Sequence, residues 1–311
     1  MLNILTIEQQ EAAGNVDQPV FDKQSMMAAR AHLDRLIRRG AGRTTSEIVS
    51  ITPEMASLLL ARNPEDENRK LSLAIVKRYA TDMSAGRWNG LNGQTIVISD
   101  DGYLNDGQHR LNAIIEAGVT VPMLVVVGAS RESRMTLDQN KVRKSGDYLR
   151  MAGMARGNQV ASIATNLMYY ERGVVPMKGG SPKYGNMITK AEIHEYALAH
   201  EAEIMGAIHI ADQYNQVSPV VITHLAFALI VLNRAAGDDA VQFVRQVASG
   251  ESLTRGMAAY HVRNRLQSER RLGQIRPGKV LECMIRGWNA HRTTGRMSRL
   301  QLQGRMPRIE A

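Results

Sequence analysis

One stretch, residues 105–111 with the sequence NDGQHRL, gathers polar residues whose types and spacing suit chemistry. Gly107 permits a backbone turn that a side chain would hinder. Backbone N–H groups at the start of a following helix, together with the helix dipole, favour an anion. Arg110 in the first helical turn could hold a phosphate through two hydrogen bonds. The stretch therefore predicts a pocket for a phosphate or a nucleotide.

Three neighbours of Gly107 could complete such a site. Asp106 could cap the helix or, with a nucleotide present, help to hold a divalent ion. Gln108 and His109 could bond a base, a sugar or a phosphate. A structural alternative stays open, because spacing alone does not decide it. In that alternative the stretch is a capped turn, in which Asp106 bonds the backbone and Arg110 pairs with an acid.

Asp138 is a second candidate carboxylate, in a polar segment that follows the last expected strand. Asp138 and Asp106 could bind a metal ion or act as a general base. The alternative is that the segment is only a polar linker between domains. The eight His residues and the single Cys lack the spacing of metal ligands, so we predict no resident metal site.

The elements that must position these residues follow a short pattern. We expect a strand, a hairpin turn, a return strand, a helix and a final strand over residues 95–98, 100–102, 103–105, 111–117 and 121–127. The first strand is β-branched throughout (TIVI), which favours a buried strand. Gly118 ends the helix, and Pro122 suits an edge strand or the first position of a strand.

Helical patterns surround this region on both sides. Before it, apolar spacing predicts helices near residues 26–37, 52–60 and 70–86. After about residue 130 the chain looks helical to its end, and residues 218–232 are apolar enough for the central helix of a bundle. We therefore expect an α+β protein, with a small mixed sheet and helices followed by an all-α C-terminal domain. The expected divisions are an N-terminal arm and helix (1–45), the site domain (46–130), a helical domain (131–275), and an amphipathic helix with a basic tail (276–311).

The net charge of +9 is concentrated near the C-terminus. Residues 255–311 carry 13 Lys and Arg against three acids, whereas the other 254 residues carry 26 bases and 27 acids. A nearly neutral body with a basic segment fits a polyanion, most simply DNA, with the arginines of 255–308 supplying phosphate contacts. Two alternatives stay open: the basic segment serves solubility, or it packs against acidic residues in the rest of the chain.

Composition excludes several classes of protein. A single Cys excludes a disulfide scaffold, and no run of 18 apolar residues predicts a membrane span. The first 25 residues contain four acids and no apolar core of a signal peptide. We expect a cytoplasmic protein, with no membrane partner.

Residues 93–128 resemble the ParB/sulfiredoxin superfamily. Domains of that superfamily have two strands joined by a hairpin, a Gly-x-x-Arg box that opens a helix, and a strand after a turn that begins with Gly and ends with Pro. The matching pieces here are residues 94–99, 100–102, 107–110 and 118–122. Residues 106–110 also spell the motif of the DGQHR family. Upstream, Asn68-Arg69, Tyr79 and Gly86-Arg87-Trp88 look like the helical lead-in of ParB-like proteins of phages and mobile elements.

The resemblance implies roles for single residues. In ParB-type domains the box binds nucleotide phosphates through its backbone and its arginine, and CTP or ATP can be hydrolysed. These roles would fall to Gly107 and Arg110, with Gln108 and His109 between them. Sulfiredoxins have a catalytic Cys where Gln108 stands, which excludes their reductase chemistry. Chromosome-partitioning ParB proteins have Arg where His109 stands and carry a helix-turn-helix, which we do not identify here.

The resulting expectation is a DNA-associated, nucleotide-binding, ParB-like protein of phage or mobile-element type, in the cytoplasm of a bacterial host. Its cofactor would be CTP or ATP with Mg²⁺, held by Gly107, Gln108, Arg110 and Asp138. A catalytic role would fall to Asp106, His109 and Arg110. One alternative is an enzyme acting on DNA, either a nuclease or a base-modifying transferase, and another is a structural or interaction protein. A homodimer is among the assemblies this interpretation allows.

Overall fold

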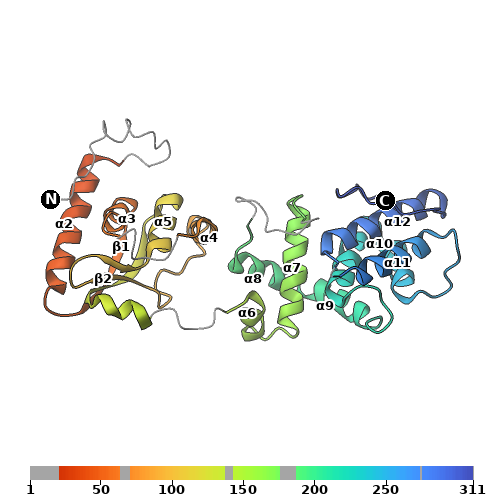
Figure 1. The fold of residues 1–311 in the computed structure, drawn as a ribbon, viewed down its shortest axis with the longest axis horizontal. Coiled ribbons are helices and arrows are strands. Elements are labelled where there is room, and N and C mark those ends of the chain that lie inside the picture. The colour runs from red at the N-terminus through yellow and green to blue at the C-terminus, as the bar shows by residue number, and fades with distance from the viewer. Residues whose placement is uncertain (1–20, 64–70, 137–142, 176–186, 274, 311) are drawn as a thin grey trace. The chain divides into compact units, whose positions relative to one another are not determined.

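The computed structural model describes residues 21–63, 71–136, 143–175, 187–273 and 275–310 (Figure 1). The chain divides into two compact units, residues 1–141 and 142–311. The expected class, α+β with a small mixed sheet and a helical C-terminal region, is confirmed. The expected segments 1–45 and 46–130 both fall in the first unit.

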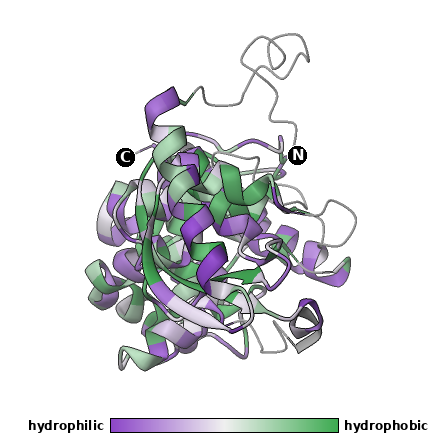
Figure 2. Cartoon of the chain, turned by 90° about the vertical axis from the view of Figure 1, so that its left-hand side faces the viewer, coloured by the Kyte–Doolittle hydropathy of each residue, from purple (hydrophilic) through white to green (hydrophobic). Residues whose placement is uncertain are grey.

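A four-stranded sheet organises the first unit. Its strands are β1 (Thr45–Ile51), β2 (Thr95–Ser99), β3 (Leu104–Asp106) and β4 (Val121–Ala129), in the order β1-β4-β2-β3. The hairpin of β2 and β3 is antiparallel, as predicted, and β4 runs parallel to β2. Strands β2 and β4 are rich in Val and Ile, and Figure 2 shows green, apolar ribbon within the sheet. Strand β3 ends at Asp106, and helix α5 (Gln108–Ala117) begins two residues later.

Strand β1 is not among the predicted elements. It pairs antiparallel with β4, with Thr45 opposite Val127 and Ile51 opposite Val121. Because β1 takes one edge of the sheet, β4 is an inner strand, so of the two positions expected for Pro122 the structure shows the one at the start of a strand and not the one on an edge strand. Pro122 is tolerated there because the ladder to β2 begins two residues later, at Leu124.

Four helices complete the described part of the first unit: α2 (Lys23–Gly40), α3 (Pro53–Leu60), α4 (Leu73–Ser84) and α5 (Gln108–Ala117). Helix α3 begins as predicted, because Thr52 Oγ1 accepts the N–H of Met55 and Pro53 occupies the first helical position. Helices α3 and α4 pack on α5, and α2 packs on α3 and β4. Helix α5 is thus held from two sides. A short 3₁₀ turn, η1 (Arg131–Thr136), follows β4.

The second unit is helical in its described residues. Its helices are α6 (Ser145–Met151), α7 (Gly157–Glu171), α8 (Lys190–Ala199), α9 (Glu201–Asp212), α10 (Ile222–Ser249), α11 (Ala258–Arg271) and α12 (Pro277–Thr294). The predicted central helix is confirmed as α10, which contacts α7, α9, α11 and α12. It runs beyond the predicted end at residue 232 and is interrupted at Gly237, where φ is 65° and ψ is −151°. No helix in the described part of the chain combines the length and apolar character that crossing a membrane requires.

The segment after α12 is packed on that helix. Trp288 Nε1 donates to the carbonyl oxygen of Glu310 at 2.7 Å, and the N–H of Gln303 donates to Glu282 Oε1 at 2.6 Å. Leu300 is buried in the core of the unit. The predicted basic tail is therefore a surface of the second unit with a defined course over residues 296–310.

Candidate functional site

The predicted turn at residue 107 is present and requires glycine. Gly107 has φ of 118° at the N-cap position of α5, in the left-handed region that side chains disfavour. A Cβ atom built there would lie 2.5 Å from Cδ1 of Ile96 on β2. The close approach of β2 and the start of α5 therefore depends on this glycine.

Asp106 uses both carboxylate oxygens inside the turn. Its Oδ1 accepts the N–H of Gly107 at 2.7 Å, and its Oδ2 accepts a hydrogen bond from Arg110 Nη2 at 2.8 Å. The second contact is also an ion pair across one turn of helix. Asp106 thus fixes the turn and compensates the charge of Arg110.

Arg110 points into the protein and is only 7% exposed. Besides Asp106, its guanidinium donates to Gln94 Oε1 at 2.9 Å and to the carbonyl oxygen of Thr95 at 2.6 Å. Its Nε is buried without a hydrogen-bond partner among the described residues. This is the arrangement of the structural alternative, in which Arg110 pairs with an acid. A direct grip on phosphate by this side chain would require these contacts to break.

Gln108 and His109 connect α5 to the neighbouring helices. Asn63 Nδ2 donates to Gln108 Oε1 at 3.3 Å, just after α3. The N–H of Ser72, at the start of α4, donates to His109 Nε2 at 3.0 Å. His109 Nε2 therefore carries no proton in this arrangement, because it accepts a hydrogen bond. Both side chains orient the start of α5 relative to α3 and α4.

The N-terminus of α5 is a second feature of the predicted pocket that does not involve the arginine. No side chain caps this helix, and its first turn holds no acid. The first N–H groups of a helix lack partners within the helix and attract anions. The backbone here, rather than Arg110, is the group with the right chemistry for a phosphate.

The described residues do not fit a Mg²⁺ ion at this turn. Asp106 is already engaged by Arg110 and by the N–H of Gly107, so its charge is neutralised. Asp138, the other expected carboxylate, lies outside the described residues. Within the described ranges, no group of three or more His, Cys, Asp or Glu could hold a metal ion.

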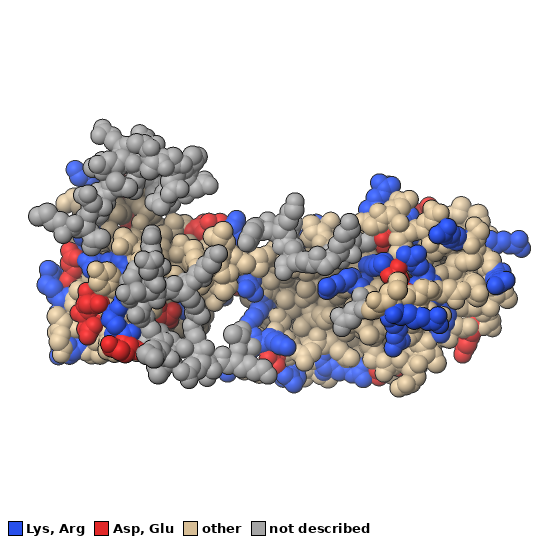
Figure 3. Space-filling view, in the orientation of Figure 1, with Lys and Arg blue, Asp and Glu red and all other residues tan. Residues whose placement is uncertain are grey.

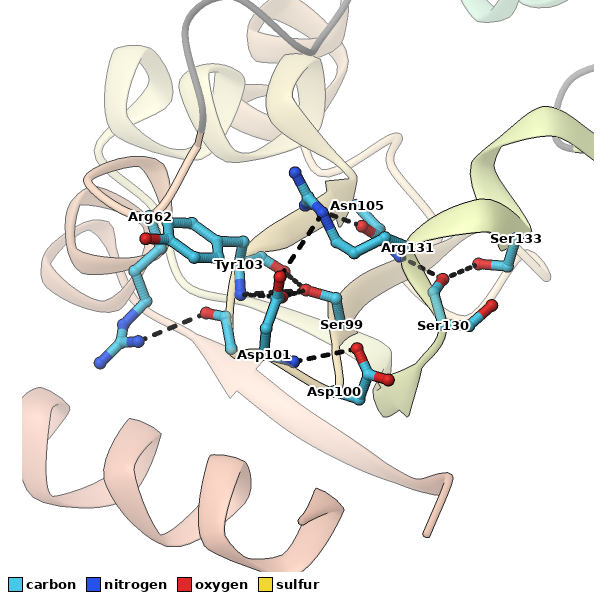
Figure 4. Close-up of polar contacts among 10 residues, drawn as sticks. Arg62, Ser99, Asp100, Asp101, Tyr103, Asn105, Ser130, Arg131 and Ser133 are labelled. Atoms are coloured by element: carbon cyan, nitrogen blue, oxygen red, sulfur yellow. Dashed lines mark hydrogen bonds and ion pairs between the residues drawn. The ribbon is translucent and has the colours of Figure 1, made fainter. Parts of the chain in front are cut away.

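A polar cluster that the sequence did not predict surrounds the β2–β3 hairpin (Figure 4). Arg131 of η1 lies over the ring of Tyr103, 5.5 Å from its centroid, and donates to Asn105 Oδ1 at 3.0 Å. Asn105 in turn donates to the carbonyl oxygen of Ser130 at 3.0 Å. Together these contacts tie β3 to the turn after β4.

Two acids, Asp100 and Asp101, lie in the turn of this hairpin, and the pKa of Asp101 is shifted. Partial burial acts to raise its pKa, but hydrogen bonds from Ser99 and Tyr103 and the charge of Arg131 outweigh burial and lower the pKa below its usual value. Arg131 Nε lies 3.7 Å from Asp101 Oδ2. The cluster is internally balanced in charge, which favours a structural role for it.

The arginines of the C-terminal region divide into two groups. Arg265 and Lys279 pair with Glu269, Arg286 pairs with Glu282, and Arg263 binds backbone carbonyls at the end of α10. The remainder includes exposed arginines that form no hydrogen bond or ion pair through their side chains with described residues: Arg271, Arg276, Arg296, Arg299 and Arg308. We call these five residues the arginine surface. On the side of the second unit that faces the viewer in Figure 3, Lys and Arg side chains are more prominent than acids.

No family model matches the chain, and no match is found among curated proteins or among solved structures.

Proposed function

We propose that this chain is a DNA-associated protein whose arginine surface contacts phosphates of the duplex. The observation that carries the proposal is that five exposed arginines on the helices and the packed segment of the second unit have no acidic partner among the residues that the structure describes. Arg271 ends α11, Arg276 precedes α12, and the other three lie on the segment packed against α12. Cations held in place without acidic partners favour a polyanion.

In this proposal the first unit is ParB/sulfiredoxin-like, and it holds a nucleotide phosphate, of CTP or ATP, at the start of α5. The position of this helix N-terminus, directly after the glycine turn and with no acid in its first turn, supports this role. Arg110 acts as a positioning residue, since it fixes Asp106 and β2 around the turn. The proposal is limited to binding, because no contact among the described residues favours the nuclease or the transferase.

Charge reversal on the packed C-terminal segment tests the DNA-binding role. Arg296→Glu with Arg299→Glu removes two side chains of the arginine surface, neither of which is buried. We expect duplex DNA affinity, measured by fluorescence anisotropy at about 0.1 M salt, to fall at least tenfold, because two phosphate contacts become repulsions.

The matched control makes the same change of charge in the first unit. Arg35→Glu with Arg38→Glu alters two exposed residues of α2. We expect this variant to keep most of the wild-type affinity. Equal losses in both variants would mean that only net charge matters, and would contradict a defined arginine surface.

A further inference from the structure

An open cavity of about 710 Å³ lies within the second unit, and all of its lining residues belong to that unit. The second half of α10 forms one wall and the C-terminal turns of α12 form another, and Tyr214, just after α9, also lines it. Ligand pockets for small molecules are typically about 300–1,000 Å³. The volume therefore suits a ligand of the size of a nucleotide.

The floor of the cavity is aromatic. Phe243 and Trp288 are buried and meet edge to face, with ring centroids 5.9 Å apart. His291 is exposed, and its ring lies 5.3 Å from Phe243 and 5.7 Å from Trp288. Tyr214 is half-buried. His291, whose ring contacts both buried rings, and Tyr214, which also lines the cavity, thus offer aromatic surface to a planar group.

Arg245 supplies a cation at the wall. It is half-buried on α10, and it forms no hydrogen bond or ion pair with any residue that the structure describes. Its Nε is buried without a hydrogen-bond partner. A partly desolvated charge that lacks a partner is unfavourable, so an anionic ligand at this point would stabilise the protein.

Polar groups surround this cation. Gln242 and Gln246 lie one helical turn apart on the same wall and offer amide donors and acceptors. Two carboxylates, Asp239 and Glu251, also line the cavity, but both are exposed and their repulsion of an anion is screened by solvent. Arg292 lies 5.7 Å from the ring of Trp288 and adds a second positive charge.

We propose that this cavity binds a nucleotide, with the base against the rings of Tyr214 and His291 and the phosphate at Arg245. The ligand chemistry is a planar aromatic base joined to a phosphate, which a free mononucleotide and a single strand of DNA share. The mononucleotide form is independent of the proposed DNA binding, whereas the single-strand form rests on it.

Calorimetric titration of the full chain separates these sources. The ligands are a deoxynucleoside 5′-monophosphate, the matching nucleoside, inorganic phosphate, a single-stranded oligonucleotide and a duplex. We expect the monophosphate or the single strand to bind at least about tenfold more tightly than nucleoside or phosphate alone, since base and phosphate both contribute. Binding by the monophosphate identifies a free ligand as sufficient, and binding by the single strand alone identifies the nucleic acid.

Two variants locate the binding. Arg245→Gln removes the cation, and Gln242→Glu adds a repelling charge at an exposed position that does not affect the core. Each is expected to lower affinity about tenfold, with the melting temperature as a check on folding. The matched control for the second is Asn233→Asp, which adds the same charge on the same helix outside the cavity.

Three results would overturn the proposal. They are an absence of binding by both nucleotide ligands at millimolar concentration, binding that both variants leave unchanged, and phosphate alone binding as tightly as the nucleotide. Duplex binding that responds to the arginine-surface variants but not to Arg245→Gln would leave the DNA proposal standing and reject the cavity. The two proposals therefore fail separately.

Discussion

Arg110 Nη2 lies 2.8 Å from Asp106 Oδ2, so the arginine and the acid of the same five-residue box neutralise each other. The pair connects the end of β3 to the first turn of α5, and the same guanidinium reaches Thr95 on β2. The box is thus a structural joint between two strands and a helix. The guanidinium is already engaged by Gln94, Thr95 and Asp106.

Removing Arg110 should destabilise the protein. Arg110→Met leaves Asp106 without its cation and frees the carbonyl oxygen of Thr95, and we expect a loss of about 3 kcal/mol in the free energy of unfolding. Asp106→Asn keeps the contact to the N–H of Gly107 and should cost less. The double variant should lose at least about 1 kcal/mol less than the sum of the two single losses, as measured by urea denaturation. Additive losses would show that the ion pair contributes nothing.

A charge at Gln108 tests nucleotide binding without breaking the joint. Gln108→Glu keeps the acceptor for Asn63 and places an acid in the first turn of α5, where the helix dipole favours it. We expect unchanged or higher thermal stability of the free protein but a smaller stabilisation by CTP or ATP. A ligand at 100 times its dissociation constant stabilises the wild type by about 2.7 kcal/mol.

Asn92→Asp is the control for that experiment. It makes the same kind of change at an exposed residue of the first unit and keeps the acceptor for the N–H of Gln94. The stabilisation of this control variant by CTP or ATP should equal that of the wild type. If CTP or ATP also stabilises Gln108→Glu as much as it stabilises the wild type, the phosphate does not lie at the start of α5.

The raised pKa of Tyr196 predicts that the protein loses stability at alkaline pH. Burial and the hydrogen bond to Glu171 raise its pKa from 10.0 to about 12, against the opposing effect of Arg234. Because the folded pKa lies above the unfolded one, this contribution to stability is complete below pH 10 and is lost as pH rises toward 12.

The measurement is the free energy of unfolding at pH 9 and pH 11. Tyr196→Phe should show a weaker decline between these two values than the wild type, since the group that titrates is gone. The control is Tyr103→Phe, which removes an exposed phenol of the first unit. If the free energy of unfolding of Tyr196→Phe falls between pH 9 and pH 11 as much as that of the wild type, groups other than Tyr196 cause the loss of stability.

Local patterns predicted the parts of the fold that depend on near neighbours. The hairpin, the glycine turn at residue 107 and the start of α3 were all visible as short motifs. Strand β1 was not, because its partner β4 lies more than 70 residues away and Ile48 is exposed. Half-buried polar strands of this kind show no strong local signal.

The candidate site could likewise be predicted only in part, because some of its contacts join residues that are distant in the sequence. The box residues were found from their spacing, but the burial of Arg110 depends on Gln94 and Thr95, which the sheet brings to it. The cavity in the second unit was not predicted, since its walls come from α10 and α12 and from the segment after α9. The residues next to Arg245 in the sequence do not reveal that its side chain has no hydrogen-bond partner among the described residues.

The most direct test of the central claim is the salt dependence of duplex DNA binding by the wild-type chain. Each phosphate neutralised contributes about −0.9 to the slope of log affinity against log salt concentration. If the five residues of the arginine surface contact phosphates, the slope should be about −4.5, and Arg296→Glu with Arg299→Glu should reduce its magnitude by about 2. A slope near zero, or one that the double variant leaves unchanged, would contradict the account.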